Sequence, residues 1–205
     1  MENKSLKEFT ILSASKEPVP GGGGVSAAVG SLAASLGEMV TNLTIGKKTY
    51  AQYEEELISF KNELETLRIE LLNCINNDAK AFEPLAKAYS MPKDSPDYES
   101  TMEKCLVDAA ASPFQILKLT TRVIEIDERL AVIGSKLAVS DAATSVMLAH
   151  GVLYGAYINI IVNTRLMKNH EYADDLNNKS KAMLNEYAKK ALDIFEQINK
   201  RLTNG

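Results

Sequence analysis

Residues 18–50 decide the fold, and they read PVPGGGGVSAAVGSLAASLGEMVTNLTIGKKTY. Glu38 is the only charged residue between Glu17 and Lys47, and small or apolar residues dominate the run after the glycines. A helix that is small or apolar on every side belongs inside a bundle, where other helices cover it. The stretch therefore predicts an all-α helical bundle with this small-residue helix at its centre.

Four consecutive glycines, Gly21 to Gly24, stand at the start of that helix. Such a run costs backbone entropy when it is ordered, so it marks unusual torsions or a close approach to the backbone. A flexible hinge is the simpler interpretation from glycine count alone. The alternative is a binding site, because the first N–H groups of a helix attract an anion. A phosphate-binding loop is excluded, because no Gly-Lys-Ser/Thr follows at the required spacing.

The same stretch is long enough to span a membrane, but its composition argues against a span. Besides the glycines it contains several polar residues: Ser31, Ser35, Thr41, Asn42 and Thr44. Polar residues at this density are unfavourable in the hydrocarbon core of a bilayer. We therefore expect a core helix and no membrane contact.

Composition limits the possible partners. The chain has 205 residues, 45% hydrophobic and 24% charged, which predicts a single domain over residues 1–205. Its net charge of −4 argues against nucleic acid as the main partner. The two cysteines and two histidines lack the spacing of a zinc site, so we expect no metal. The N-terminus leads into an amphipathic segment without an apolar signal region, which predicts a cytoplasmic protein.

A second long helix is predicted from Tyr50, because apolar residues then recur at alternating steps of three and four. They are Tyr50, Tyr53, Leu57, Phe60, Leu64, Leu67, Leu71 and Cys74. The next position of this heptad seam is Asp78. A carboxylate on a buried seam indicates a functional site, because its desolvation needs compensation. Alternatively, the helix ends near Asn76 and Asp78 caps the next helix; the sequence leaves both interpretations open.

The remaining chain predicts four more helices in an up-and-down arrangement. They cover residues 4–14, 98–129, 140–167 and 174–202, with a kink expected at Pro113. A loop is expected over residues 90–97 and a turn over residues 134–140. Ser140 and Asp141 form a typical N-cap for the helix that follows.

The helix over residues 140–167 is the second small-residue helix expected at the centre. Asp141 and His150 are its only acidic or basic residues before Arg165. A stripe of small and amide residues recurs along it at every fourth position: Gly151, Gly155, Asn159 and Asn163. Buried amides need hydrogen-bond partners, which are either other helices or a polar heterocyclic ligand. Packing against helices is the simpler explanation.

Several short motifs are distinctive when taken together. They are PGGGGVSAA at residues 20–28, MVTNLTIGKK at 39–48, DAKAF at 78–82, Ser140-Asp141, and NIIVN at 159–163. With these motifs the chain resembles, over nearly its whole length, the cyclodeaminase/cyclohydrolase family of folate one-carbon metabolism. That family includes the cyclodeaminase domain of formiminotransferase-cyclodeaminase and stand-alone methenyltetrahydrofolate cyclohydrolases. Family members often have Gly-Asn where this chain has Gly134-Ser135.

The resemblance implies a helical homodimer that binds a folate and uses no metal or further cofactor. The implied reaction is hydrolysis of methenyltetrahydrofolate to 10-formyltetrahydrofolate, or release of ammonia from formiminotetrahydrofolate. Both need a carboxylate beside the one-carbon unit, and Asp78 and Asp141 are the candidates. Lys48 is a candidate for polarising an intermediate. The implied substrate-binding residues are Gly21, Gly22, Gly23, Gly24, Ser26, Asn42, Lys47, Ser140, Asn159, Asn163 and Arg165.

A different class of function is a non-catalytic helical dimer that serves as a binding or scaffold module. It explains the small-residue helices and the heptad seam equally well, but it leaves Asp78 on that seam unexplained. The sequence does not decide between the two folate reactions.

Overall fold

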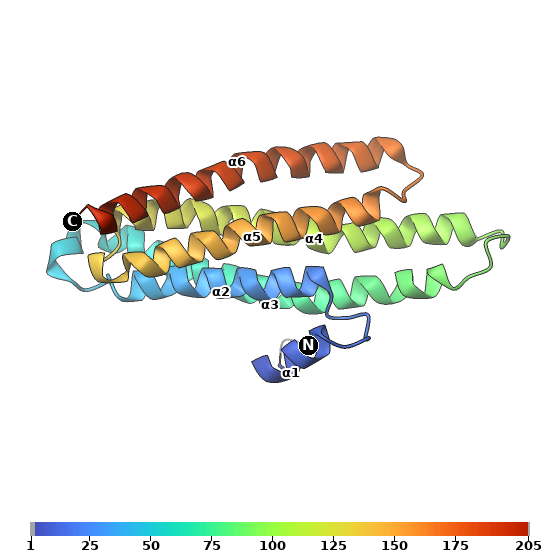
Figure 1. The fold of residues 1–205 in the computed structure, drawn as a ribbon, viewed down its shortest axis with the longest axis horizontal. Helices are drawn as coiled ribbons and strands as arrows, with labels where there is room; N and C mark the ends of the chain where they lie inside the picture. Colours follow the sequence, from blue (N-terminus) through green and yellow to red (C-terminus); the bar gives the residue numbers. More distant parts are fainter. Residues whose placement is uncertain (1–2, 205) are drawn as a thin grey trace.

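A computed structural model describes residues 3–204, and every regular element in that range is helical (Figure 1). Two short 3₁₀ helices, η1 (Lys48–Tyr53) and η2 (Lys136–Ala138), accompany six α-helices. These are α1 (Leu6–Ser13), α2 (Gly22–Asn42), α3 (Glu54–Tyr89), α4 (Tyr98–Ile133), α5 (Val139–Thr164) and α6 (His170–Thr203). The all-α prediction is confirmed, since no strand occurs within residues 3–204.

Helices α2 to α6 run up and down in chain order and form an elongated bundle (Figure 1). α2 packs against α3, α4 and α5, while α5 packs against α2, α4 and α6. Small buried residues of α2, such as Ala27, Gly30 and Ala34, allow this close packing. The two small-residue helices are thus the central ones, as the sequence predicts.

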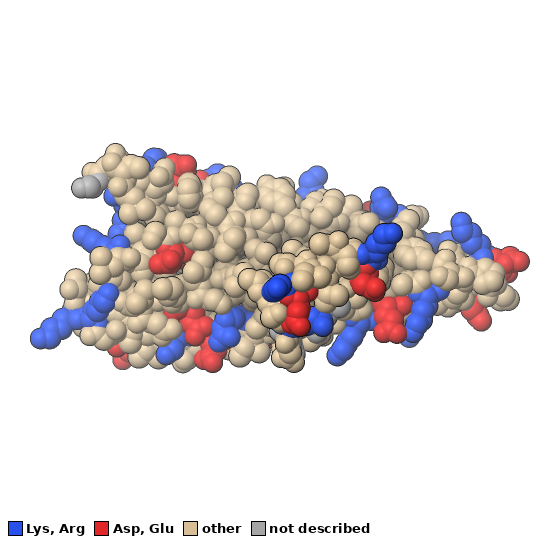
Figure 2. All heavy atoms as spheres, turned by 60° about the horizontal axis from the view of Figure 1, so that its bottom comes forward, with Lys and Arg blue, Asp and Glu red and all other residues tan. Residues whose placement is uncertain are grey.

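One side of the two central helices is nevertheless exposed. Leu32 and Met39 of α2 are 53% and 46% exposed, and Tyr154 and Ile158 of α5 are 51% and 59% exposed. Figure 2 shows a broad area with few charged side chains on the side where α2 and α5 lie. We call the surface formed by these four residues the apolar strip. Nothing in the chain that the structure describes covers it.

Length and composition alone would allow two segments, Gly22–Asn42 and Lys136–Thr164, to span a membrane. In the bundle, 50% and 39% of their most apolar windows are buried by other parts of the chain. Core helices of globular proteins pass the same test, so the finding is weak support for a span.

α3 decides the question that the sequence left open about Asp78. The helix continues without interruption from Glu54 to Tyr89, through Asn76 and Pro84. Five residues of the predicted seam are buried: Leu57, Leu64, Leu67, Leu71 and Cys74. Asp78 therefore lies on the buried face of a continuous helix and does not cap a new one.

The helices of the bundle differ in length, so its two ends differ in shape. α3 and α4 each have 36 residues, whereas α2 has 21 and α5 has 26. The far end of the α3–α4 pair, with the loop of residues 90–97, projects beyond the other helices (Figure 1). This loop has the bounds that the sequence predicts, because α3 ends at Tyr89 and α4 begins at Tyr98.

Two predicted helix starts are wrong. α5 begins at Val139 after the short η2, so Ser140 lies inside its first turn and Ala138 is the N-cap, without a side-chain hydrogen bond. α6 begins at His170 and not near residue 174, because the Asn169 side chain accepts a hydrogen bond from the N–H of Tyr172. Asparagine is a favoured N-cap residue, so Asn169 is a signal that the sequence prediction did not use.

A second aspartate lies in the core, in α4. Asp127 has no exposed surface, and its Oδ2 atom forms a hydrogen bond of 2.6 Å with the Ser145 hydroxyl of α5. The same Ser145 hydroxyl lies 2.8 Å from the Ala33 carbonyl oxygen of α2. Asp127 Oδ1 has no hydrogen-bond partner. Burial raises the pKa of Asp127 well above its ordinary value, and the Ser145 hydrogen bond only partly opposes this.

Candidate functional site

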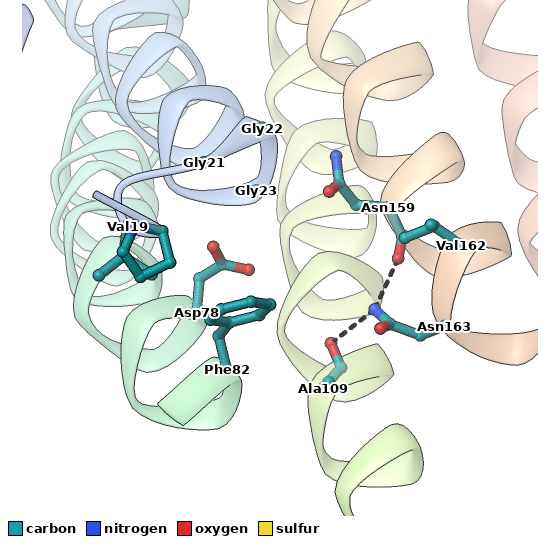
Figure 3. Close-up of a pocket in the computed structure, with 11 residues that line it drawn as sticks. Val19, Gly21, Gly22, Gly23, Asp78, Phe82, Ala109, Asn159, Val162 and Asn163 are labelled. Carbon is teal, nitrogen blue, oxygen red and sulfur yellow. Dashed lines mark hydrogen bonds between the residues drawn. The ribbon is translucent and has the colours of Figure 1, made fainter. Parts of the chain in front are cut away.

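A cavity of about 150 Å³ lies where the start of α2 meets the last third of α3 and of α5 (Figure 3). Apolar side chains and bare backbone form much of its wall, and three polar side chains face it. The lining residues are Pro18, Val19, Gly21, Gly22, Gly23, Asp78, Phe82, Ala109, Asn159, Val162 and Asn163. The cavity thus combines one carboxylate and two amides at a helix N-terminus.

The glycines allow the polar side chains to approach the backbone of α2. A Cβ atom on Gly23 would lie 2.2 Å from Asp78 Oδ1, and one on Gly22 would lie 2.9 Å from Asn159 Nδ2. Any other residue at Gly23 would collide with the carboxylate. Gly22 to Gly24 form the first turn of α2, so the hinge interpretation is wrong and the close-approach interpretation holds.

Asp78 lies beside the positive end of the α2 dipole, and the N–H of Gly24 donates a hydrogen bond to its carboxylate. Burial is nevertheless the larger influence on its pKa. It raises the pKa of Asp78 above the ordinary value, while the Gly24 hydrogen bond lowers it in part. A carboxyl group with a raised pKa keeps its acid form to higher pH than an ordinary carboxyl group, which suits a group that both accepts and donates a proton.

Both amides have their nitrogen atoms engaged by backbone carbonyls. Asn163 Nδ2 donates to the Asn159 carbonyl at 2.8 Å and to the Ala109 carbonyl at 3.3 Å, as Figure 3 shows. Asn159 Nδ2 donates to the Gly155 carbonyl at 2.7 Å. Helix packing and ligand contact, the two explanations of these amides, therefore combine here: their nitrogens bind helices, and both residues line a cavity.

Several predicted site residues lie at the opposite end of the bundle. Asn42 ends α2, Lys47 and Lys48 follow it, and Ser140 and Asp141 stand in the first turn of α5. Asp141 comes 18 residues before Asn159. At 1.5 Å per residue, the two are roughly 27 Å apart along α5. The two candidate carboxylates, Asp78 and Asp141, therefore do not share one cavity within a single chain.

The opposite end has its own polar contacts. Lys47 Nζ donates a hydrogen bond of 2.9 Å to Ser135 Oγ, and the Ser135 N–H donates one of 2.9 Å to Thr44 Oγ1. Ser135 therefore binds two parts of the segment that follows α2. We call Lys47, Lys48, Ser135 and Asp141 the lysine end.

Three predicted binding residues lie near the cavity without lining it. Gly24 has no side chain, and it contributes its backbone N–H, which donates a hydrogen bond to Asp78. Ser26 Oγ donates to the Gly22 carbonyl at 2.7 Å, and a Cβ atom on Gly155 would lie 2.4 Å from that hydroxyl. The absence of a side chain at Gly155 therefore lets Ser26 of α2 pack closely against α5. Arg165 is exposed at the C-cap of α5, two residues after Asn163.

The sequence did not point to Pro18, Val19, Ala109 or Val162 as lining residues. Apolar side chains and a backbone carbonyl carry no chemical pattern that would reveal them. Within residues 3–204, no three His, Cys, Asp or Glu side chains are placed so that they would hold a metal ion.

Known proteins resemble this chain in sequence and in fold. The family model of formiminotransferase-cyclodeaminase matches residues 5–182. The chain is 30% identical to the methenyltetrahydrofolate cyclohydrolase of Methylorubrum extorquens over 204 residues, or 98% of both proteins. It is 23% identical to the formimidoyltransferase-cyclodeaminase of Sus scrofa, covering 97% of this chain but 38% of that longer protein. The crystal structure of formiminotetrahydrofolate cyclodeaminase from Thermotoga maritima superimposes with a TM-score of 0.85 at 30% identity, covering 99% of this chain and 98% of that one.

Proposed function

Because the chain belongs to the formiminotransferase-cyclodeaminase family and is a folate one-carbon enzyme of the cyclohydrolase/cyclodeaminase type, we propose that its reaction takes place at the Asp78 cavity. Hydrolysis of methenyltetrahydrofolate is the reaction we favour, since the full-length relative of Methylorubrum extorquens carries that name. Ammonia release from formiminotetrahydrofolate is the second candidate, favoured by the name of the Thermotoga maritima structure.

The observation that carries this proposal is the contact between Asp78 and the first turn of α2. In methenyltetrahydrofolate the bridging carbon belongs to a cationic amidinium, and a partly buried carboxylate attracts a cation. Water attacks that carbon while Asp78 accepts one of its protons. As the bond from the carbon to N5 breaks, Asp78 returns a proton to N5 and the hydroxyl loses one to solvent, leaving the formyl group on N10.

In the cyclodeaminase reaction the same carboxyl group acts first as a proton donor. N10 attacks the formimino carbon, and the departing nitrogen must gain a proton to leave as ammonia. Asp78 is suited to donate it, because burial raises its pKa and keeps more of the acid form. A metal or redox cofactor has no part in either scheme.

A homodimer is the second part of the proposal. The apolar strip on α2 and α5 is unpartnered within one chain, and a surface of this kind marks an interface. A two-fold axis perpendicular to α2 and α5 would bring the lysine end of one chain toward the Asp78 cavity of the other. Lys48, Lys47, Asp141, Ser140 and Asn42 would then complete the site in the partner.

The test of the proposed reaction is absorbance. Methenyltetrahydrofolate has a near-ultraviolet band that disappears on hydrolysis and appears when the formimino substrate cyclises. We expect the protein to change this band in at least one direction well above the buffer rate. A protein that binds folate but leaves both substrates unchanged would be the non-catalytic scaffold instead. We further propose a cytoplasmic enzyme without nucleic-acid or membrane partners.

A further inference from the structure

The amide of Asn163 has only one orientation that satisfies its neighbours. Its Nδ2 atom carries two hydrogens, and the carbonyls of Asn159 and Ala109 take one each. In the reversed orientation Oδ1 would face two carbonyl oxygens, which repel it. Asn159 is held in the same way by the Gly155 carbonyl at 2.7 Å. Helices α4 and α5 therefore fix which end of each amide remains for a ligand.

The Oδ1 atoms, which are acceptors, remain on both amides, and Asn159 Nδ2 also keeps one hydrogen on the Gly22 side. Asn159 and Asn163 keep their Oδ1 atoms, and the Asp78 carboxylate faces the same space from α3 (Figure 3). The donors in this cavity come from the other side, from the first-turn backbone of α2 at Gly22 and Gly23. A small molecule with several hydrogens on one heavy atom fits among these acceptors, whereas a carbonyl oxygen does not.

We propose that Asn163 and Asn159 are positioning residues for the small group that enters or leaves the one-carbon unit, either the attacking water or the departing ammonia. The proposal rests on the function proposed above and names the part of the substrate that these amides hold. Water donates one hydrogen to Asn163 Oδ1 and the other to Asp78, so its lone pair is directed at the amidinium carbon. Ammonia, leaving with its N–H groups toward the same oxygens, occupies the same place.

Because water and ammonia occupy the same position beside Asn163 and Asp78, ammonia should compete with water for the methenyl carbon on the enzyme. Its nitrogen attacks, Asp78 takes one of its protons, the bond from the carbon to N10 breaks, and N10 gains a proton. The product is the formimino compound, which is cyclodeamination in reverse.

The first experiment uses the unaltered protein. Methenyltetrahydrofolate is supplied with increasing ammonium chloride at constant pH and ionic strength, and formyl and formimino products are separated. We expect formyl product to fall and formimino product to rise with ammonia, beyond the ratio in enzyme-free buffer. If the rate of formyl product formation stayed unchanged and no enzyme-dependent formimino product formed, water and ammonia would not share one binding position. No turnover of either folate substrate would instead refute the proposed function.

The second experiment separates positioning of the small group from binding of the folate. Asn163→Leu removes the acceptor, and we expect kcat to fall about tenfold to a hundredfold with KM changed less than about threefold. Asn163→Ser keeps a shorter acceptor and should lie between. Leu166→Ala, at an exposed residue three positions beyond Asn163 that does not line the cavity, is the control and should spare kcat. A large rise in KM at unchanged kcat in Asn163→Leu would show that the amide holds the folate ring, which contradicts the proposal.

Discussion

Asp78 and Asp127 both lie on helix faces that are otherwise apolar, but their surroundings differ. Asp78 borders a cavity, takes a hydrogen bond from a backbone N–H, and faces two amide oxygens. Asp127 has no exposed surface and touches one hydroxyl. In both, burial raises the pKa. The carboxyl that a ligand reaches is suited to chemistry, and the sealed one to holding helices together.

Hydrogen counting shows how Asp127 holds them. The Ser145 hydroxyl has one hydrogen but lies within bonding distance of both the Ala33 carbonyl and Asp127 Oδ2. Both contacts are hydrogen bonds only when Asp127 carries a proton and donates it to Ser145. A neutral Asp127 then links α4, α5 and α2 in one chain. The ionised form would leave a buried charge without a counter-charge.

The largest expected effect separates the two aspartates by activity. Asp78→Asn keeps the shape but cannot transfer a proton, so turnover should fall by about a hundredfold or more. Asp127→Asn is the matched control, and its turnover should stay within about twofold because it is remote from the cavity. Initial rates from methenyl absorbance measure both. Equal losses of turnover in the two variants would contradict a catalytic role for Asp78 that Asp127 lacks.

The pH profile sharpens the same comparison. Since the pKa of Asp78 is raised, its basic form grows as pH increases through that raised pKa, and hydrolysis should rise over the same interval. The rising limb should be absent from the residual activity of Asp78→Asn and present in Asp127→Asn. If Asp78→Asn kept the limb, another group would be the base.

The second-largest effect concerns the lysine end. Asp141→Asn should also lower turnover by about a hundredfold if that carboxylate completes the partner's site. Mixing it with Asp78→Asn under subunit exchange should restore about a quarter of the normal rate, because half the random dimers have one intact site. The control is each variant exchanged with itself. A mixture that stays inactive, although exchange is verified, contradicts a shared site.

The third effect tests the close approach at the first turn of α2. Gly23→Ala places a Cβ atom 2.2 Å from Asp78 Oδ1, so the carboxylate must move. We expect turnover to fall about tenfold and stability to fall by about 1–3 kcal/mol. Gly24→Ala is the graded control, because its Cβ would meet Pro20 at 3.2 Å and Asp78 only at 3.8 Å. Urea unfolding and initial rates measure both losses, and Gly23→Ala should lose more stability and more turnover than Gly24→Ala. A larger loss in Gly24→Ala would be inconsistent with this geometry.

The smallest effect concerns stability and pH at Asp127. The folded protein holds a proton there that the unfolded chain loses above about pH 4, since its ordinary pKa is 3.8. The free energy of unfolding therefore falls as pH rises from that value toward the raised pKa, by at most about 1.4 kcal/mol per pH unit. Asp127→Asn donates to Ser145 at every pH, so urea unfolding should show a flatter profile. A profile as steep as that of the unaltered protein would mean that Asp127 is ionised in the fold.

The sequence predicted Asp78 but not Asp127, although the same rule applies to both. In α4 the apolar residues Val123, Ile124, Leu130 and Ala131 flank Asp127 at helical spacing. A check of that helix position by position would have found it. What no sequence pattern contains is the Ser145 contact, because a serine on a small-residue helix does not reveal its partner.

Counting residues would also have separated Asp78 from Asp141. In an up-and-down bundle with short connections, α3 runs antiparallel to α2, so a residue two-thirds of the way along α3 lies beside the start of α2. The start of α5 lies at the opposite end of the bundle. The family motifs could not separate the two aspartates, because motifs indicate which residues are distinctive and not where in the fold they lie. The helix types, the seam from Tyr50 to Cys74 and the loop of residues 90–97 depended only on local patterns, which explains why they were predictable.

The projecting end of the α3–α4 pair has a practical consequence. Past Phe82 and Ala109, which line the cavity, the two helices continue to an exposed tip at residues 90–97. Lys93 and Asp94 at that tip are exposed, and the tip lies roughly 15 Å beyond the cavity along the helix axis. A peptide tag or fluorophore grafted there would anchor the protein to a surface while leaving the cavity and the apolar strip accessible. The bundle thus has a natural handle for immobilised assays and single-molecule observation.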